Sequence, residues 1–221
     1  MLIDDGRVVP EDSIHYLTEN LADKAISYVH RYRQQPFFMY LAFNAVHTPV
    51  EAPLLHNDKY SKVADPMRRA YLPMLENMDS SIGRLIEQLK RDGLYENTLI
   101  IFMNDNGAAT NNGADNGQLR GLKGSKWEGG IRVPMIIQWP ARLPKGQVAD
   151  AMVSGMDILP TSIDAIRGKN IPGQQLDGVS LLSSYKTVKN GHDYLFWRRG
   201  VAKAVRHAEW KLIVVKDDPM L

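Results

Sequence analysis

The sequence of 221 residues contains no cysteine, which excludes disulfide bonds, thiolate metal sites and a cysteine nucleophile. This absence leaves the compartment open, because exported proteins can also lack cysteine. The sequence also lacks an apolar run of the roughly 20 residues that a membrane-spanning helix needs, and acidic rather than basic residues closely follow Met1. We therefore expect a soluble chain with no membrane partner.

Neither sign of charge predominates in the sequence. Twenty-seven Lys and Arg residues stand against 25 Asp and Glu, the net charge is +2, and the basic residues are scattered rather than gathered into a stripe. This pattern argues against a nucleic-acid partner. With 44% hydrophobic residues, the chain can bury one substantial core, or one core with a small appended lobe.

Apolar periodicity predicts two amphipathic helices with a buried strand between them. The first helix is expected from a cap at Thr18 to about Gln34, and the second from about Arg68 to Arg91. Residues 37–43 are apolar on both alternating faces, as in a strand that is covered on two sides in a parallel sheet.

Two further strands are expected at residues 98–103 and 133–139. The order of strand, helix, strand, loop and strand predicts an α/β core with parallel strands and flanking helices. After about residue 170, short strand-like segments alternate with turns, which predicts a small antiparallel sheet. We therefore predict a partial core over residues 1–170 and the start of a small C-terminal antiparallel subdomain over residues 171–221.

Polar side chains follow two of the expected strands. Ligands of open α/β sheets bind beyond the carboxyl ends of the strands, which places His47, Asp105 and Asn106 at one edge. A carboxylate beside a carboxamide offers hard oxygen donors for Ca²⁺ or Mg²⁺, and an imidazole can donate to an anion or protonate a leaving group. Taken alone, Asp-Asn-Gly is also a common turn sequence, and a loop histidine is commonly only a surface residue.

A glycine-rich basic segment spans residues 119–134. Four glycines let the backbone approach a ligand, and Lys123 can present a compact positive charge to an oxyanion. Such loops also bind phosphate or are merely flexible. Glu128 and Arg132 are four residues apart, and the simplest interpretation is a structural ion pair.

Several of these segments together resemble the type I sulfatases, and most closely the group of arylsulfatase A and N-acetylgalactosamine-6-sulfatase. The resemblance covers roughly residues 15 to 215, and its pieces occur in the order and spacing of that family: Pro36-Phe37-Phe38-Met39-Tyr40-Leu41-Ala42-Phe43-Asn44, His47-Thr48-Pro49, Asn104-Asp105-Asn106-Gly107, Lys123-Gly124, Glu128-Gly129-Gly130-Ile131-Arg132-Val133-Pro134 and Met156-Asp157-Ile158-Leu159-Pro160-Thr161.

The resemblance implies an alkaline phosphatase-like sulfatase core and hydrolysis of aryl or carbohydrate sulfate esters. It implies that Asp105 and Asn106 are two ligands of a Ca²⁺ ion, with Mg²⁺ as the other hard cation, while His47 and Lys123 contact the sulfate group of the substrate. Relatives are usually periplasmic, extracellular or lysosomal, and nothing in this sequence chooses among these compartments.

The family nucleophile is a hydrated formylglycine made within a Cys/Ser-x-Pro-x-Arg motif, which this sequence does not contain. Residues 64–68 have the Pro-x-Arg register, but they begin with Ala64, which has no nucleophilic atom. The resemblance thus implies a carboxyl-side portion of an incomplete core. Such a chain should be nearly inert, and should associate with a complementing amino-terminal fragment or with itself through an exposed sheet edge.

Two other functions are compatible with the same residues. One is a phosphate-ester hydrolase of the alkaline phosphatase superfamily, whose members usually have Asp-His where this chain has Asp105 and Asn106, so the amide favours the sulfatase. The other is a non-catalytic protein that binds sulfated glycans.

Overall fold

The computed structural model describes residues 2–4, 6–10, 13–53, 58–169, 173–182, 191–215 and 218–220. The chain divides into two compact units. The first unit comprises Met1–Thr98 with Ala108–Asp115, and the second comprises Leu99–Gly107 with Asn116–Leu221.

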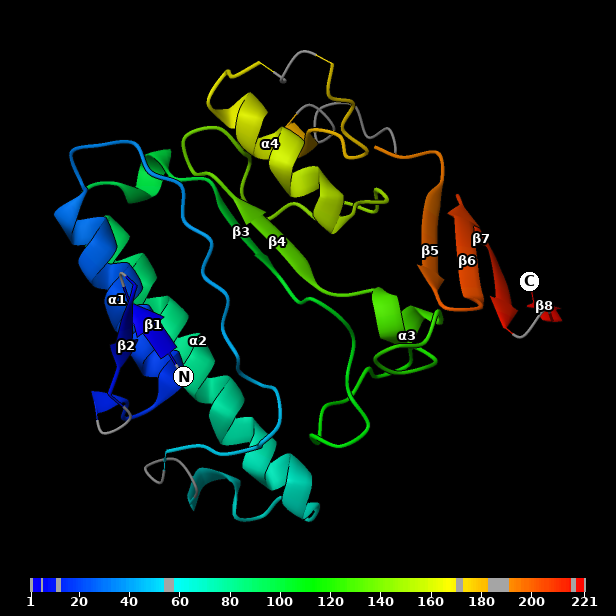
Figure 1. Cartoon of the computed structure of the whole chain (residues 1–221), viewed down its shortest axis with the longest axis horizontal. Coiled ribbons are helices and arrows are strands. Elements are labelled where there is room, and N and C mark those ends of the chain that lie inside the picture. The colour runs from blue at the N-terminus through cyan, green and yellow to red at the C-terminus, as the bar shows by residue number, and fades with distance from the viewer. Residues whose placement is uncertain are drawn as a thin grey trace. The chain divides into compact units, whose positions relative to one another are not determined.

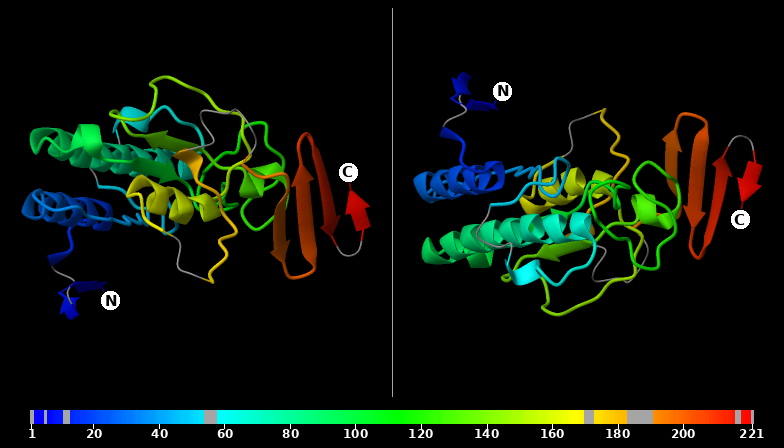
Figure 2. Two further views of the ribbon diagram at one scale, coloured as in Figure 1. Left: turned by 90° about the horizontal axis from the view of Figure 1, so that it is seen from above. Right: turned by 90° about the horizontal axis from the view of Figure 1, so that it is seen from below.

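The first unit is built on two long helices that lie side by side, α1 (Leu17–Arg31) and α2 (Pro66–Arg91) (Figures 1 and 2). Both predicted helices are confirmed. Their facing stripes bury small and apolar side chains: Ala22, Ala25, Val29, Met74, Ser81 and Leu89.

The ends of these helices depend on local sequence. The prediction that Thr18 caps α1 is wrong, because the helix begins at Leu17 and Thr18 is buried inside its first turn. The Asp65 carboxylate caps α2 by accepting a hydrogen bond from the Met67 N–H at 2.9 Å, and Pro66 occupies the first helical position, where its missing N–H costs nothing. The unit also contains a hairpin of β1 (Leu2–Asp4) and β2 (Arg7–Val9), and the 3₁₀ turns η3 (Asp58–Tyr60) and η4 (Tyr95–Asn97).

Residues 37–43 do not form the predicted buried strand. Phe38 and Tyr40 are 72% and 84% exposed, while the alternating side chains between them are partly covered. Phe37, for example, meets the ring of Tyr28 edge-on, with the ring centroids 6.2 Å apart. A strand needs a neighbour for its backbone hydrogen bonds, and none pairs with this segment in the part of the chain that the structure describes. The apolar run is therefore extended but half exposed.

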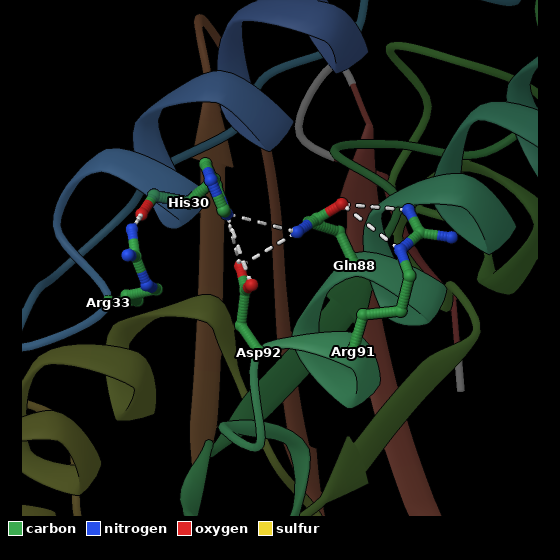
Figure 3. A network of polar contacts seen from close by, with 5 residues as sticks. All are labelled: His30, Arg33, Gln88, Arg91 and Asp92. Carbon is green, nitrogen blue, oxygen red and sulfur yellow. Dashed lines mark hydrogen bonds and ion pairs between the residues drawn. The ribbon is translucent and has the colours of Figure 1, made fainter.

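A polar network joins the carboxyl ends of α1 and α2 (Figure 3). Asp92 accepts hydrogen bonds from Gln88 Nε2 at 2.8 Å and from His30 Nδ1 at 3.1 Å. Arg91 donates to Gln88 Oε1 at 2.7 Å, and Arg33 donates to the His30 carbonyl at the same distance. The hydrogen bond from Gln88 and, to a smaller extent, that from His30 lower the pKa of the Asp92 carboxyl.

The second unit contains β3 (Ile100–Met103) and β4 (Met135–Gln138), at the two positions where strands were expected. They pair antiparallel, with Ile101 opposite Ile137, so the prediction of parallel strands is wrong for this pair. The connection from β3 to β4 contains only one turn of helix, α3 (Glu128–Ile131). A parallel pair would need a crossover helix that returns the chain to the end of the sheet where β3 begins, and residues 104–134 contain none.

The C-terminal part of the second unit is an antiparallel sheet with the strand order β5 (Leu195–Arg199), β6 (Ala202–His207), β7 (Trp210–Val215) and β8 (Asp218–Met220) (Figure 1). The predicted antiparallel lobe is confirmed as a sheet, and β8 was not predicted. The domain boundary near residue 170 stays a prediction.

The remaining helix of the second unit, α4 (Ile158–Ala165), follows the 3₁₀ turn η5 (Gly155–Asp157) and is anchored by a buried carboxylate. Asp157 has no exposed surface and accepts from the Ser154 N–H at 2.7 Å, from the Val179 N–H at 2.9 Å and from His192 Nε2 at 2.7 Å. Thr161 continues this network by accepting from the Leu181 N–H at 2.9 Å. The Met156–Thr161 segment thus has a structural role.

The lowered pKa of Asp92 generates a pH prediction. Because the native pKa is depressed, the ionised carboxylate stabilises the fold at neutral pH, and this stabilisation is lost as the pH falls through the native pKa. Asp92→Asn should therefore lower the unfolding midpoint at pH 7, and its difference from the parent should shrink on acidification. Thermal melts from pH 7 to pH 3 measure this. The control is Asp79→Asn, which removes an exposed carboxylate of α2, and identical pH profiles for the two variants would contradict the prediction.

The Asp157 network generates a stability prediction. Replacing a buried, paired carboxylate with alanine leaves its partners unsatisfied, so Asp157→Ala should cost about 3 to 5 kcal/mol of unfolding free energy. Denaturant unfolding measures the loss. Asp150→Ala, which removes an exposed carboxylate in the same unit, should change the unfolding free energy little, and an equally small effect of Asp157→Ala would refute the assigned role.

Candidate active site

Asp105 and Asn106 lie directly after the carboxyl end of β3, as predicted. Asp105 Oδ1 accepts from the Asn106 N–H at 2.8 Å, and Asn106 Nδ2 donates to the Gly107 carbonyl at 3.0 Å. These local bonds hold the turn together. They leave one carboxylate oxygen of Asp105 and the amide oxygen of Asn106 without a hydrogen-bond partner among the described residues, and both are hard oxygen donors.

The turn after β3 is held against the glycine-rich segment by backbone contact. The Gly107 N–H donates to the Gly130 carbonyl at 3.2 Å, and a Cβ at position 107 would overlap the Gly129 carbonyl. Only glycine fits at such a close approach. The loop with the two oxygen donors and the segment that begins with Lys123 are therefore packed together within the second unit.

Lys123 lies in an exposed turn of this segment, closed by a hydrogen bond from the Ser125 N–H to the Leu122 carbonyl at 2.9 Å. Lys123 makes no ion pair with any residue that the structure describes. No carboxylate of the described residues therefore neutralises the charge of Lys123. A lysine that contacts an oxyanion needs such an unneutralised charge.

His47 belongs to the first unit. Its Nδ1 lies 2.8 Å from the Thr48 carbonyl oxygen, and since a carbonyl only accepts, Nδ1 carries a proton in this arrangement. Asn112 Nδ2 donates to the Val46 carbonyl at 3.1 Å and so ties the His47 loop to residues 108–115. The convergence of His47 with Asp105, Asn106 and Lys123 stays a prediction.

The donor set matches part of a hard-cation site. A carboxylate oxygen and an amide oxygen suit Ca²⁺ or Mg²⁺, but Ca²⁺ takes six to eight oxygens. No group of three or more His, Cys, Asp or Glu side chains is gathered in metal-binding geometry in the described ranges. Asp105 and Asn106 therefore fit as two ligands of such an ion, and the site needs further ligands.

Glu128 has partners that the sequence did not indicate. Arg132, its predicted partner, lies at 3.8 Å, whereas Lys211 of β7 lies at 2.5 Å and Arg206 of β6 at 3.2 Å. The closer pairs join residues about 80 positions apart, and no local signal predicts them. They fasten α3 and the preceding loop to the C-terminal sheet (Figure 1).

Comparisons with known proteins identify the family of this fold. The profile of the sulfatase family matches residues 8–168, and the chain belongs to that family. It is 33% identical to arylsulfatase J of Mus musculus over 201 residues, which cover 81% of this chain and 34% of that protein. It is also 33% identical to N-acetylgalactosamine-6-sulfatase of Canis lupus familiaris over 193 residues, 83% of this chain and 35% of that protein.

Solved structures support the fold. The crystal structure of Ps i-CgsB in complex with k-i-k-neocarrahexaose is similar with a TM-score of 0.90 at 34% identity, covering 97% of this chain and 49% of that one. A protein of the alkaline phosphatase superfamily from Vibrio parahaemolyticus has a TM-score of 0.64 at 15% identity over 97% of this chain and 48% of that one, which bears on the fold alone. The predicted class, a partial alkaline phosphatase-like sulfatase core, is confirmed. The chain spans about a third of the length of the curated relatives that it matches.

Proposed function

We propose that this chain supplies metal-binding and sulfate-contacting residues to a sulfatase that hydrolyses aryl or carbohydrate sulfate esters. Asp105 and Asn106 hold Ca²⁺, or Mg²⁺ as the other hard cation, while Lys123 and His47 contact the sulfate. The observation that carries the proposal is the hydrogen bond from Gly107 to Gly130, because it holds the loop of oxygen donors against the segment of Lys123.

The chemistry of sulfate ester hydrolysis explains why these groups belong together. Negative charge must be stabilised on the non-bridging oxygens of sulfate and on the departing alkoxide or phenoxide. A bound divalent cation supplies part of this stabilisation as a Lewis acid. The ammonium group of Lys123 is a compact, unpaired charge in the described structure, which suits one oxygen of a tetrahedral anion.

The contact between His47 and Thr48 restricts what the imidazole can do. The Nδ1–H donates to the Thr48 carbonyl, which leaves Nε2 for a ligand. Nε2 of a neutral ring can only accept a hydrogen bond, whereas Nε2 of an imidazolium carries a proton and can donate one. Contact with an anionic oxygen, or protonation of a leaving group, therefore requires the imidazolium form.

A carbohydrate sulfate is the favoured substrate class. Ps i-CgsB, the structural neighbour at 34% identity, is described in complex with k-i-k-neocarrahexaose, which supports a carbohydrate rather than a small aryl group. The amide of Asn106 supports a sulfate ester over a phosphate ester, since the rival phosphatases usually use imidazole at that position. Bound zinc and hydrolysis of a phosphate ester would overturn this assignment.

A complete enzyme also requires the nucleophile. The 221 residues contain no Cys/Ser-x-Pro-x-Arg motif, so we infer that a complementing segment provides it. The half-exposed apolar segment with Phe38 and Tyr40 is the surface that we assign to that complementing segment.

The two metal ligands generate a binding prediction. Titration of the 221-residue chain with CaCl₂, followed by calorimetry, should show binding that Asp105→Ala weakens at least tenfold, because a carboxylate ligand is lost. Asp177→Ala removes an exposed carboxylate from the same unit and should leave the affinity unchanged. Equal calcium affinity in the parent and Asp105→Ala would exclude Asp105 as a ligand.

The missing motif generates an activity prediction. Sulfate release from 4-nitrophenyl sulfate by the 221 residues alone should not exceed the uncatalysed rate, with or without Ca²⁺. Turnover above that rate by the purified chain, unaffected by Lys123→Gln, would show that the chemistry uses another site. Free sulfate and nitrophenolate are both measured, because hydrolysis of the ester releases them in equal amounts, whereas absorbance from another source is not accompanied by sulfate.

A further inference from the structure

The segment that follows Lys123 carries a second group of cations. Lys126 is only 7% exposed, and in the described ranges it makes no ion pair. The Arg199 guanidinium, at the end of β5, occupies the space where a Cβ of Gly124 would lie. Gly124 has a φ of 90°, so the bare backbone at this position admits the arginine.

The sheet presents several cations on the same face. Successive residues of a strand point to opposite faces, so Trp197 and Arg199 share one face of β5 while Arg198 lies on the other. Leu195 lies on the same face as Arg199 and is opposite Arg206 of β6, which in turn is opposite Lys211 of β7. Arg206 and Lys211 therefore lie on the face of Arg199. Lys211 Nζ indeed lies 5.3 Å from the centroid of the Trp197 ring.

Glu128, the carboxylate that the described contacts place against this face, is engaged by three cations. Glu128 Oε1 accepts from Lys211 at 2.5 Å, and Oε2 accepts from Arg206 at 3.2 Å and lies 3.8 Å from Arg132. Among the described residues, no ion pair joins Glu128 to Lys126 or Arg199. The buried ammonium of Lys126 is therefore placed near like charges without a counterion in the described structure, an arrangement that an anion relieves.

The pKa of Lys126 agrees with this arrangement. Burial, followed by the charges of Arg199 and Lys211, lowers the pKa of the Lys126 ammonium. An anion bound beside Lys126 and Arg199 would offset the repulsion between these cations.

We propose that Lys126 and Arg199 form a second anion subsite beside Lys123, which binds another sulfate or carboxylate group of the same carbohydrate substrate. This inference rests on the proposed function and specifies its substrate as a polyanionic carbohydrate. Lys123 and Lys126 are three positions apart, so their Cα atoms lie at most about 10 Å apart even in extended chain. Both cations therefore belong to one short stretch of the loop, as contact with substituents on the same or neighbouring sugar units requires.

The test uses two probes, a monosulfated galactose disaccharide and the same disaccharide with a second sulfate. Binding to the 221-residue chain in CaCl₂ is measured by calorimetry. The parent should bind the disulfated probe about tenfold more tightly, as one charge-assisted contact allows. Arg199→Gln and Lys126→Met should remove this preference and leave the affinity for the monosulfated probe unchanged, whereas Lys123→Gln should weaken both.

Matched controls separate a local site from overall charge. Arg198→Gln and Lys203→Met make the same charge changes at exposed residues on the opposite face of the sheet, and they should retain the tenfold preference. Arg199 is exposed, so its substitution tests the site even if Lys126→Met unfolds.

The outcomes distinguish the inference from the proposed function. Equal binding of the two probes by the parent, or a preference that survives Arg199→Gln, would overturn the second subsite and leave the sulfatase assignment intact. Loss of the preference in both control variants would also overturn it, because overall charge would then suffice. A parent that binds neither probe would overturn the subsite together with the proposed sulfate-binding role of Lys123.

Discussion

The candidate site depends on a backbone contact between the turn after β3 and α3 that leaves no room for a side chain at position 107. Gly107 follows the Asp105-Asn106 turn, and its N–H donates to the Gly130 carbonyl at 3.2 Å. A side chain at position 107 would overlap the Gly129 carbonyl. This contact brings the oxygen donors of Asp105 and Asn106 together with the segment that carries Lys123. Either segment without the other would be an ordinary turn.

A second constraint attaches the C-terminal sheet to this arrangement. Glu128 begins α3, and its carboxylate is shared by Lys211, Arg206 and the more distant Arg132. In the described structure, Lys126 and Arg199 are not among the partners of this carboxylate. If these two residues form the proposed second anion subsite, the C-terminal sheet contributes to ligand binding in addition to stabilising the second unit.

Much of the local structure could be predicted from patterns of neighbouring residues. The two long helices were predicted because apolar side chains three and four residues apart bury one stripe against each other, and Val29 and Leu89 lie in those stripes. The positions of β3 and β4 and the antiparallel C-terminal strands followed from apolar runs bounded by turns. Residues 37–43 show the limit of this reasoning, since an apolar run becomes a strand only if another strand lies beside it.

The sequence by itself determined the family, the helices, and the four candidate residues His47, Asp105, Asn106 and Lys123, because motif order and short-range periodicity are local properties of the chain. Only the tertiary structure decided the antiparallel pairing of β3 with β4, the ties of Asp157 to His192 and of Glu128 to Lys211, and the burial of Lys126 against unpaired charge. The physical reason is that each of these joins residues separated by tens of positions, whose meeting depends on how the elements between them pack.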